Sequence, residues 1–268
     1  MQLSEIIIYP IKSLKGINLG EGMVEDQGLR HDRRWMLVDD AGDFLTQREF
    51  PQMARIWVAV RGDNLVVSAG SRSLTIPFAT GDELHEGVNV WGSSLKAAVY
   101  SDEINRWFSD VLSTKCRLVG MTQRSVRKVS PHYAVRKFRD TVSFADGYPF
   151  LLIGQSSLDD LNSRLADPVA MDRFRPNLVV DDAEPFEEDR WKKIRIGTTI
   201  FHLVKPCPRC VVTTIDQATG IALGPEPLKT LSKYRNTNGK VMFGQNLIAD
   251  QPGGTVRVGD KVEILEMR

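Results

Sequence analysis

Two of the three cysteines in this chain lie close together, in the segment Lys205-Pro206-Cys207-Pro208-Arg209-Cys210. Cysteines at this spacing occur in structural zinc sites, in redox-active dithiols, in buried apolar clusters and where one thiolate binds a soft metal. The residues around the pair favour some of these chemistries over others.

Structural zinc takes four Cys or His ligands, and the sequence offers no second closely spaced pair among its four histidines and Cys116. A thioredoxin-like dithiol opens a helix, whereas residues 211–215 are β-branched and predict a strand. Full burial of two inert cysteines conflicts with Arg209 between them, because a buried guanidinium needs a paired anion. The segment therefore predicts a loop that presents a thiolate beside a cation, suited to a soft metal or an anionic cofactor.

Basic residues beside aromatic residues, proline and glycine are further candidates for binding a phosphate group. They are Lys12 with Ser13, Arg33 and Arg175. Each of them alone is equally explained as a partner in a surface ion pair. Neither a Walker motif nor a dinucleotide-binding glycine pattern is present in the sequence.

The charge of the chain is nearly balanced, with 35 Lys and Arg against 34 Asp and Glu in 268 residues. A generic nucleic-acid or anionic-membrane binder needs a surplus of positive charge on one face, so we expect no nucleic acid and only small anionic ligands. The apolar runs are far shorter than the roughly 20 residues of a membrane span, and the N-terminus lacks the features of a secretory signal. Together with an odd, small number of cysteines, these features predict a cytoplasmic protein without a membrane segment.

Most of the sequence has the character of short β-strands, rich in β-branched and aromatic residues and separated by Gly, Asp and Pro. The expected strands are 3–9, 35–39, 56–61, 64–68, 74–77, 96–100, 194–196, 200–204, 211–215, 246–249 and 262–265, and residues 253–260 are typical of a hairpin. Apolar residues at helical spacing predict two amphipathic helices, one capped by Asp102 and one by Ser156 or Ser157. The expected fold is mainly β with some α, in two β-barrel-like units with a few packed helices.

A polar connection over residues 122–140 divides the chain, and we expect one β-rich unit in residues 1–120 and a second in residues 121–268. Residues 124–139 carry six Lys or Arg, which indicates a solvated loop or, alternatively, a rim that attracts an anionic ligand. Residues 181–189 carry six acids, which indicates a surface loop or a docking patch for a basic redox partner.

A series of motifs along nearly the whole chain resembles the MOSC (molybdenum cofactor sulfurase C-terminal) family, in the branch of the mitochondrial amidoxime-reducing component and its bacterial relatives. Segments 9–13, 32–35 and 44–49 resemble the N-terminal β-barrel region of this branch. Segments 144–150, 174–177, 207–210, 227–231 and 243–246 resemble the MOSC domain. The order and spacing of the motifs make the resemblance far more specific than any one of them.

The resemblance implies a molybdopterin-type molybdenum cofactor between the two β units, with Cys210 supplying the thiolate to molybdenum. Four residues match family positions that contact the pterin phosphate and ring: Lys12, Ser13, Arg33 and Arg175. Arg209 and backbone amides can hold cofactor oxygens. Four further residues fall in motif positions that line the same pocket: Asp146, Asn177, Pro208 and Asn246. Cys207 is not assigned to the metal.

The implied activity is reductive removal of oxygen from an N-hydroxylated compound such as an amidoxime, an N-hydroxylamine or an N-hydroxylated base, a detoxification reaction. Many bacterial relatives continue into a plant-type ferredoxin domain that needs four cysteines, and this sequence has none after Cys210. We therefore expect no iron–sulfur cluster in this chain and a separate electron-transfer protein of the ferredoxin, flavodoxin or flavin reductase type. The alternatives are a carrier of molybdenum cofactor or sulfur that uses a Cys210 persulfide, and a β-barrel binding module without activity.

Overall fold

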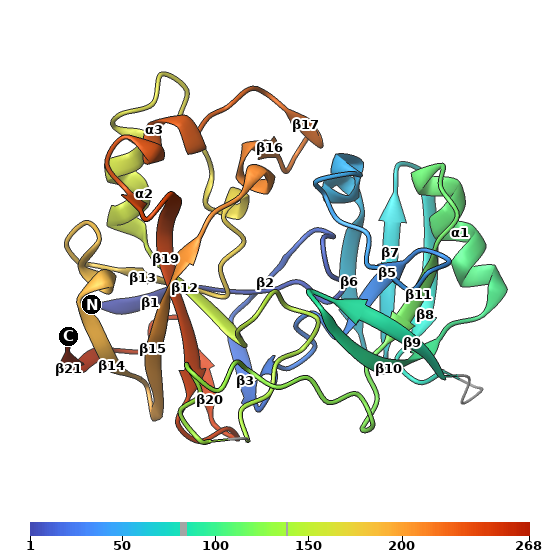
Figure 1. The fold of residues 1–268 in the computed structure, drawn as a ribbon, viewed down its shortest axis with the longest axis horizontal. Coiled ribbons are helices and arrows are strands. Elements are labelled where there is room, and N and C mark those ends of the chain that lie inside the picture. The colour runs from blue at the N-terminus through green and yellow to red at the C-terminus, as the bar shows by residue number, and fades with distance from the viewer. Residues whose placement is uncertain (81–84, 138) are drawn as a thin grey trace.

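The larger half of the molecule is built on a nine-stranded sheet (Figure 1). The structure is a computed structural model that describes residues 1–80, 85–137 and 139–268. The strand order is β2 (Ile17–Leu19), β1 (Gln2–Ile8), β13 (Leu178–Asp181), β12 (Phe150–Gly154), β19 (Lys240–Ala249), β15 (Thr199–Pro208), β14 (Trp191–Ile196) and β21 (Val262–Met267), and β18 (Asn236–Thr237) pairs with β19. β12 and β13 pair in parallel, and the helix α2 (Gln155–Asn162) lies between them in the chain.

The smaller half holds two sheets and the helix α1 (Asp102–Leu112) (Figure 1). One sheet has the order β5 (Trp35–Val38), β11 (Arg117–Gly120), β10 (Ser93–Val99) and β9 (His85–Val90), and the other has β6 (Trp57–Arg61), β7 (Asn64–Ala69) and β8 (Arg72–Pro77). Ile104, Phe108 and Leu112 on one face of α1 are buried in the core of this half, as their helical spacing predicts.

N-terminal strands pair with C-terminal strands in the larger half. β1 lies between β2 and β13, with Ile6 opposite Leu178, so the first strand completes a sheet of C-terminal strands. β20 (Thr255–Arg257) pairs with β3 (Glu21–Glu25), which also pairs with β4 (Gly28–Leu29). Shorter elements are β16 (Ile215–Asp216), β17 (Ile221–Ala222), α3 (Leu228–Ser232) and the 3-10 turns Pro51–Arg55, Met171–Arg173, Glu187–Asp189 and Val211–Thr214. The segments after β1 and β4 therefore meet the C-terminal strands where the halves join.

The predicted fold class is confirmed, since strands hold 42% and helical segments 15% of the described residues. Within the described residues, no helix has both the length and the apolar character needed to cross a bilayer. The division at residue 120 stays a prediction.

The predicted strand over residues 211–215 is wrong. Val211–Thr214 forms a 3-10 turn, and only Ile215 and Asp216 enter a strand. The Thr213 hydroxyl donates to the Cys210 carbonyl oxygen at 3.0 Å and the Thr214 hydroxyl to that of Val211 at 2.8 Å, so local side-chain bonds outweigh β propensity. Cys207, the first cysteine of the pair, lies near the end of β15. It therefore does not lie at the start of a helix, as the first cysteine of a thioredoxin-like dithiol does.

The predicted hairpin over residues 253–260 is also wrong, because β20 pairs with β3 rather than with β21. Val256 of β20 is fully buried in the core under the large sheet, and this packing sets the partner. The predicted helix caps differ by a few residues. Ser101 precedes α1 and Gly154 precedes α2, while the Ser157 hydroxyl donates to the Glu188 carboxylate at 2.9 Å.

The acidic segment 181–189 is only partly a surface. Glu188 is 1% exposed, and burial raises the pKa of its carboxyl group. Asp189 forms an ion pair with Arg235 at 2.5 Å. Two of the six acids are thus buried or paired within the fold, so fewer negative charges are left for a docking patch.

The basic segment 124–139, of which residue 138 lies outside the described residues, contains one buried cation. Arg127 is 6% exposed and its guanidinium donates to the backbone carbonyl oxygens of Ser143, Ala145 and Asp146. The expectation of a solvated loop is therefore wrong for Arg127. This residue fixes the loop that carries Asp146.

Replacing Arg127 with Met should destabilise the protein by about 3 kcal/mol, because carbonyl groups in a buried loop lose their donor. Urea unfolding of Arg127→Met against wild type measures this. Arg124, which is exposed in the same segment, provides the control, and Arg124→Met should change the unfolding free energy by less than about 0.5 kcal/mol. Equal effects of the two substitutions would contradict the role of Arg127.

Candidate functional site

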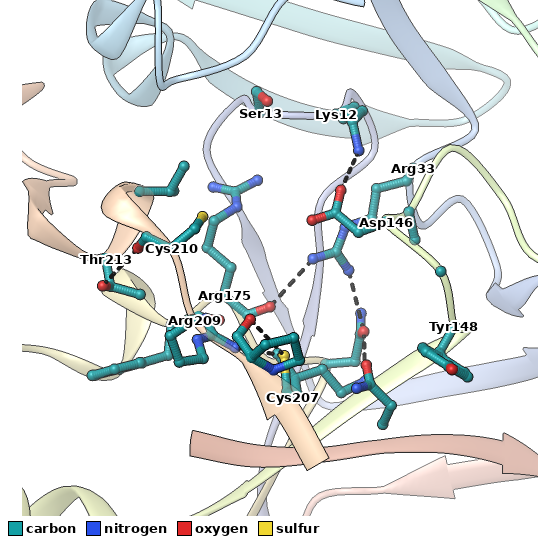
Figure 2. A pocket seen from close by; sticks show the side chains of 18 of the residues that line it. Lys12, Ser13, Arg33, Asp146, Tyr148, Arg175, Cys207, Arg209, Cys210 and Thr213 are labelled. Carbon is teal, nitrogen blue, oxygen red and sulfur yellow. Dashed lines mark hydrogen bonds and ion pairs between the residues drawn. The ribbon is translucent and has the colours of Figure 1, made fainter. Parts of the chain in front are cut away.

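One pocket at the junction of the two halves gathers every site residue predicted from the sequence (Figure 2). These residues are Lys12, Ser13, Arg33, Asp146, Arg175, Asn177, Pro208, Arg209, Cys210 and Asn246. Cys207 lines the same pocket. Figure 2 shows Lys12 and Asp146 on one side of the pocket and Cys210 on the other, with Arg175 between them and Cys207 below. The assignment of these residues to a cofactor stays a prediction.

The two pocket cysteines are free thiols with different cationic partners. Cys207, near the end of β15, accepts a hydrogen bond from Arg209 Nη1 at 3.1 Å. Cys210 precedes the 3-10 turn, and its sulfur accepts from Arg48 Nη2 at 3.2 Å. Arg48 comes from the N-terminal part of the chain, so the Cys210 environment is assembled from both halves.

Two arginines contact the aromatic ring of Tyr9. The guanidinium carbons of Arg33 and Arg175 lie 4.3 and 4.1 Å from the ring centre, and the ring itself is 1% exposed. Burial, reinforced by the like charge of Arg33, lowers the pKa of Arg175 to about 10. Burial alone would also lower the pKa of Arg33, but the Asp32 carboxylate outweighs it and raises that pKa. The pair is held as two cations close together.

Hydrogen bonds hold the Arg33 side chain in place and connect it to the backbone of Arg175. Arg33 donates to Asp32 at 2.8 Å, to Asn177 Oδ1 at 3.1 Å and to the Arg175 carbonyl oxygen at 3.2 Å. Asn177 in turn donates to the Ile7 carbonyl oxygen at 3.0 Å, which ties β1 to this network. Arg33 and Arg175 have positive φ angles of 48° and 54°, and Ser13 has 69°. Non-glycine residues in this strained region concentrate at functional sites.

Lys12 and Asp146 form an ion pair at the pocket wall, with Nζ 2.6 Å from Oδ1. Lys12 also donates to the Phe144 carbonyl oxygen at 2.9 Å, and Trp91 Nε1 donates to Asp146 Oδ1 at 3.0 Å. Loss of hydration would raise the pKa of Asp146, but the charge and hydrogen bond of Lys12, with smaller contributions from Trp91 and Arg48, hold it well below its usual value. Asp146 is therefore an ionised carboxylate at neutral pH.

Asn246 has a positioning role in the pocket wall. Its amide nitrogen lies 3.2 Å from the Lys205 carbonyl oxygen and 3.4 Å from that of Pro206. These contacts join β19 to the irregular part of β15 just before the cysteines, where the register with β19 shifts. Pro208 ends β15 and so directs the chain from that strand toward Cys210.

Several pocket residues were not predicted from the sequence. Those with polar or charged side chains are Thr46, Arg48, Tyr148 and Thr213. Arg48 lies in the segment 44–49 that resembles the family, but nothing in the residues signalled its contact with Cys210. Trp91 borders the pocket through Asp146, and it comes from a hairpin in which no site motif was recognised.

The pocket carries a large excess of positive charge. Its described lining residues include five cations, Lys12, Arg33, Arg48, Arg175 and Arg209, against the single carboxylate of Asp146. The Arg209 Nε atom is buried, and no partner for it occurs in the described residues. Residues 1–80, 85–137 and 139–268, which the structure describes, contain no cluster of three or more His, Cys, Asp or Glu side chains suited to a metal ion. The arrangement is suited to an anionic ligand that also offers a soft metal to a thiolate.

Comparison with known proteins gives consistent matches along the chain. Residues 1–115 match the model of the MOSC N-terminal beta barrel domain, and residues 139–263 match that of the MOSC domain. Mitochondrial amidoxime reducing component 2 of Rattus norvegicus is 36% identical, over 97% of this chain and 82% of that protein. Mitochondrial amidoxime-reducing component 1 of Homo sapiens is 32% identical, over 98% of this chain and 82% of that protein. Molybdenum cofactor sulfurase of Oryza sativa is 34% identical, over 91% of this chain but 32% of that protein.

The depressed pKa of Asp146 predicts a pH-dependent contribution to stability. The contribution is present above the ordinary carboxyl pKa of 3.8 and is lost as the pH falls from there toward the lower pKa of the folded state. Asp146→Asn should therefore be less stable than wild type at pH 7, and the difference should shrink below about pH 4. Urea unfolding at several pH values measures it. Asp63→Asn, at an exposed turn, is the control, and a difference for Asp146→Asn that does not change with pH would contradict the ion pair.

Proposed function

Because this chain belongs to the MOSC family, in the branch of the amidoxime-reducing components, we propose that it is a molybdenum-cofactor-dependent oxidoreductase that reduces N-hydroxylated compounds. The substrates are amidoximes, N-hydroxylamines or N-hydroxylated bases, and the reaction serves detoxification. The observation that carries the proposal is the pocket in which five cations surround two free thiols.

The residues present fit a molybdopterin-type cofactor. An anionic phosphate-bearing group would neutralise the excess of positive charge and accept a hydrogen bond from the buried Arg209 Nε atom. Molybdenum is a soft metal that accepts thiolate sulfur, and Cys210 is a free thiol beside the Arg48 cation. The strained backbone at Ser13, Arg33 and Arg175 supports a site built to hold a ligand.

Each group of residues has a proposed role toward the cofactor. Cys210 supplies the thiolate to molybdenum. Lys12, Ser13, Arg33 and Arg175 hold the phosphate and the pterin ring, and Arg209 holds cofactor oxygens. Asp146, Asn177, Pro208 and Asn246 shape the same wall, and Cys207 supports Arg209 through its 3.1 Å hydrogen bond.

When bound, the cofactor supplies two-electron chemistry for breaking an N–O bond, and the protein supplies binding, orientation and electrostatics. The overall reduction of an N-hydroxyl group consumes two electrons and two protons and releases water. Asp146 stays ionised, so it accepts hydrogen bonds from substrate N–H groups rather than donating a proton. Burial raises the pKa of Tyr148 at the pocket wall, so its hydroxyl group stays protonated and can donate a hydrogen bond.

We further propose that the electrons come from a separate protein of the ferredoxin, flavodoxin or flavin reductase type, and that the reaction takes place in the cytoplasm. The chain's three cysteines are fewer than the four that a plant-type cluster needs. An iron–sulfur cluster in this chain is therefore not part of the proposal.

A second candidate is a carrier that holds sulfur as a Cys210 persulfide. It is favoured by the similarity to the molybdenum cofactor sulfurase of Oryza sativa, although this chain spans only about a third of that relative. A persulfide carrier needs no molybdenum, so metal content separates the two functions.

Cys210→Ser should bring reduction of an N-hydroxylated substrate by a chemical electron donor to background, because the thiolate that binds the metal is lost. In Cys207→Ser, which changes a thiol that is not assigned to the metal, the rate of reduction should fall by no more than about 100-fold. Molybdenum content and steady-state rates of protein from a cofactor-competent host measure both. Near-wild-type activity of Cys210→Ser contradicts the ligand assignment, and cyanide-labile sulfur in wild-type protein without metal favours the carrier.

A further inference from the structure

The hairpin of β9 and β10 ends in an unusual turn. Val90 pairs with Ser93, so Trp91 and Gly92 form a two-residue turn, and both have positive φ angles of 49° and 77°. This geometry is that of a type I′ turn, whose first position favours Asn, Asp or Gly. A bulky side chain with positive φ is a conformational outlier. Tryptophan at this position therefore makes the turn less stable than Asn, Asp or Gly would, which points to a functional role for its side chain.

The indole of Trp91 lies beside the pocket. The hairpin projects from the smaller half toward the large sheet (Figure 1). Trp91 Nε1 donates to Asp146 Oδ1 at 3.0 Å, and the guanidinium carbon of Arg48 lies 4.9 Å from the indole centre. Arg48 in turn donates to the Cys210 sulfur at 3.2 Å. Trp91 thus contacts one residue that bonds the thiol and one that carries the pocket's carboxylate.

Both Trp91 and Asp146 keep surface free for a ligand. Trp91 is 50% exposed, although its ring also packs against Phe44 with 5.1 Å between ring centres. The Asp146 side chain is 68% exposed. Its Oδ1 atom accepts from Lys12 and Trp91, while no donor to Oδ2 occurs among the described residues. An aromatic surface therefore lies next to an open carboxylate oxygen at the pocket mouth.

We propose that Trp91 is a specificity-determining residue whose indole stacks on the flat, conjugated part of an N-hydroxylated substrate, while Asp146 Oδ2 accepts a hydrogen bond from a substrate N–H group. The inference rests on the proposed function and narrows its substrate class. Amidoximes and N-hydroxylated bases that carry an aromatic ring combine a π face with N–H donors. Stacking of a planar group on an aromatic side chain changes affinity by roughly 5- to 150-fold. Small aliphatic amidoximes keep the N–H donors but lack the ring, so they should depend much less on Trp91.

The test compares benzamidoxime with acetamidoxime on molybdenum-loaded enzyme with reduced methyl viologen as donor. Trp91→Asn removes the ring and places a residue that the turn favours, so it should fold at least as well as wild type. Trp91→Phe keeps an aromatic face and loses the indole N–H group. Trp57→Thr removes another exposed indole, on β6, with a residue suited to a strand, and serves as the matched control.

We expect KM for benzamidoxime to rise about tenfold in Trp91→Asn and less in Trp91→Phe, with KM for acetamidoxime within about twofold of wild type. The melting temperature of Trp91→Asn should not fall below that of wild type. Trp57→Thr should leave KM unchanged for both substrates. An equal rise in KM for both substrates, or no change for either, overturns the inference. An effect that appears only with a protein donor also overturns it, because Trp91 would then serve docking.

The wild-type control separates this inference from the proposed function. Loaded wild-type enzyme that reduces neither amidoxime contradicts the proposed function itself. Calorimetric binding of benzamidoxime to loaded wild type and Trp91→Asn still tests the stacking role in that case. Affinity about tenfold weaker in the variant supports the role, and equal affinity overturns it.

Discussion

The structure depends on holding several positive charges close together at the junction of its two halves. Arg33 and Arg175 both lie against the Tyr9 ring, and the pKa of Arg175 falls to about 10 because burial and the like charge of Arg33 both act against its ionised form. Asp32 neutralises Arg33, whereas Arg175 is held by the Leu14 carbonyl oxygen, the Gln217 side chain and the Tyr9 ring. An anion bound here would relieve this repulsion, so ligand binding and stability of the pocket should be coupled.

Pairing of the first strand with C-terminal strands in the large sheet fixes the N-terminal side of the pocket. β1 pairs with β13 inside the large sheet, so Lys12 and Ser13, which follow it, are fixed relative to Asn177 and Arg175, which precede β13. The Asn177 amide reinforces this by bonding Ile7, Leu151 and Arg33 at once. A site at the contact of two separately folded units would move with their relative orientation. Here Lys12 and Ser13 follow β1, and the segment with Cys207 and Cys210 follows or ends β15, and both strands belong to one hydrogen-bonded sheet.

Much of this organisation was predictable from the sequence, and the exceptions have physical causes. The fold class and the family are confirmed, because strand patterning and motif order are properties of the sequence itself. The turn at Val211–Thr214 was mistaken for a strand because its threonines bond local carbonyl groups, which β propensity does not register. The partner of β20 depends on burial of Val256 against distant strands. Arg48 and Trp91 could not be assigned, because their partners lie 162 and 55 residues away in the chain.

The two pocket thiols show why residue type alone did not define the chemistry. Cys207 takes its hydrogen bond from Arg209, two residues away, so its environment is set by the local chain. Cys210 takes its hydrogen bond from Arg48, which belongs to the other half and also lies over the Trp91 ring. The cation beside Cys210 therefore comes from a residue that lies 162 positions away in the chain. Cys210 therefore lies in a pocket that residues of both halves complete, where the surrounding cations can hold an anionic cofactor.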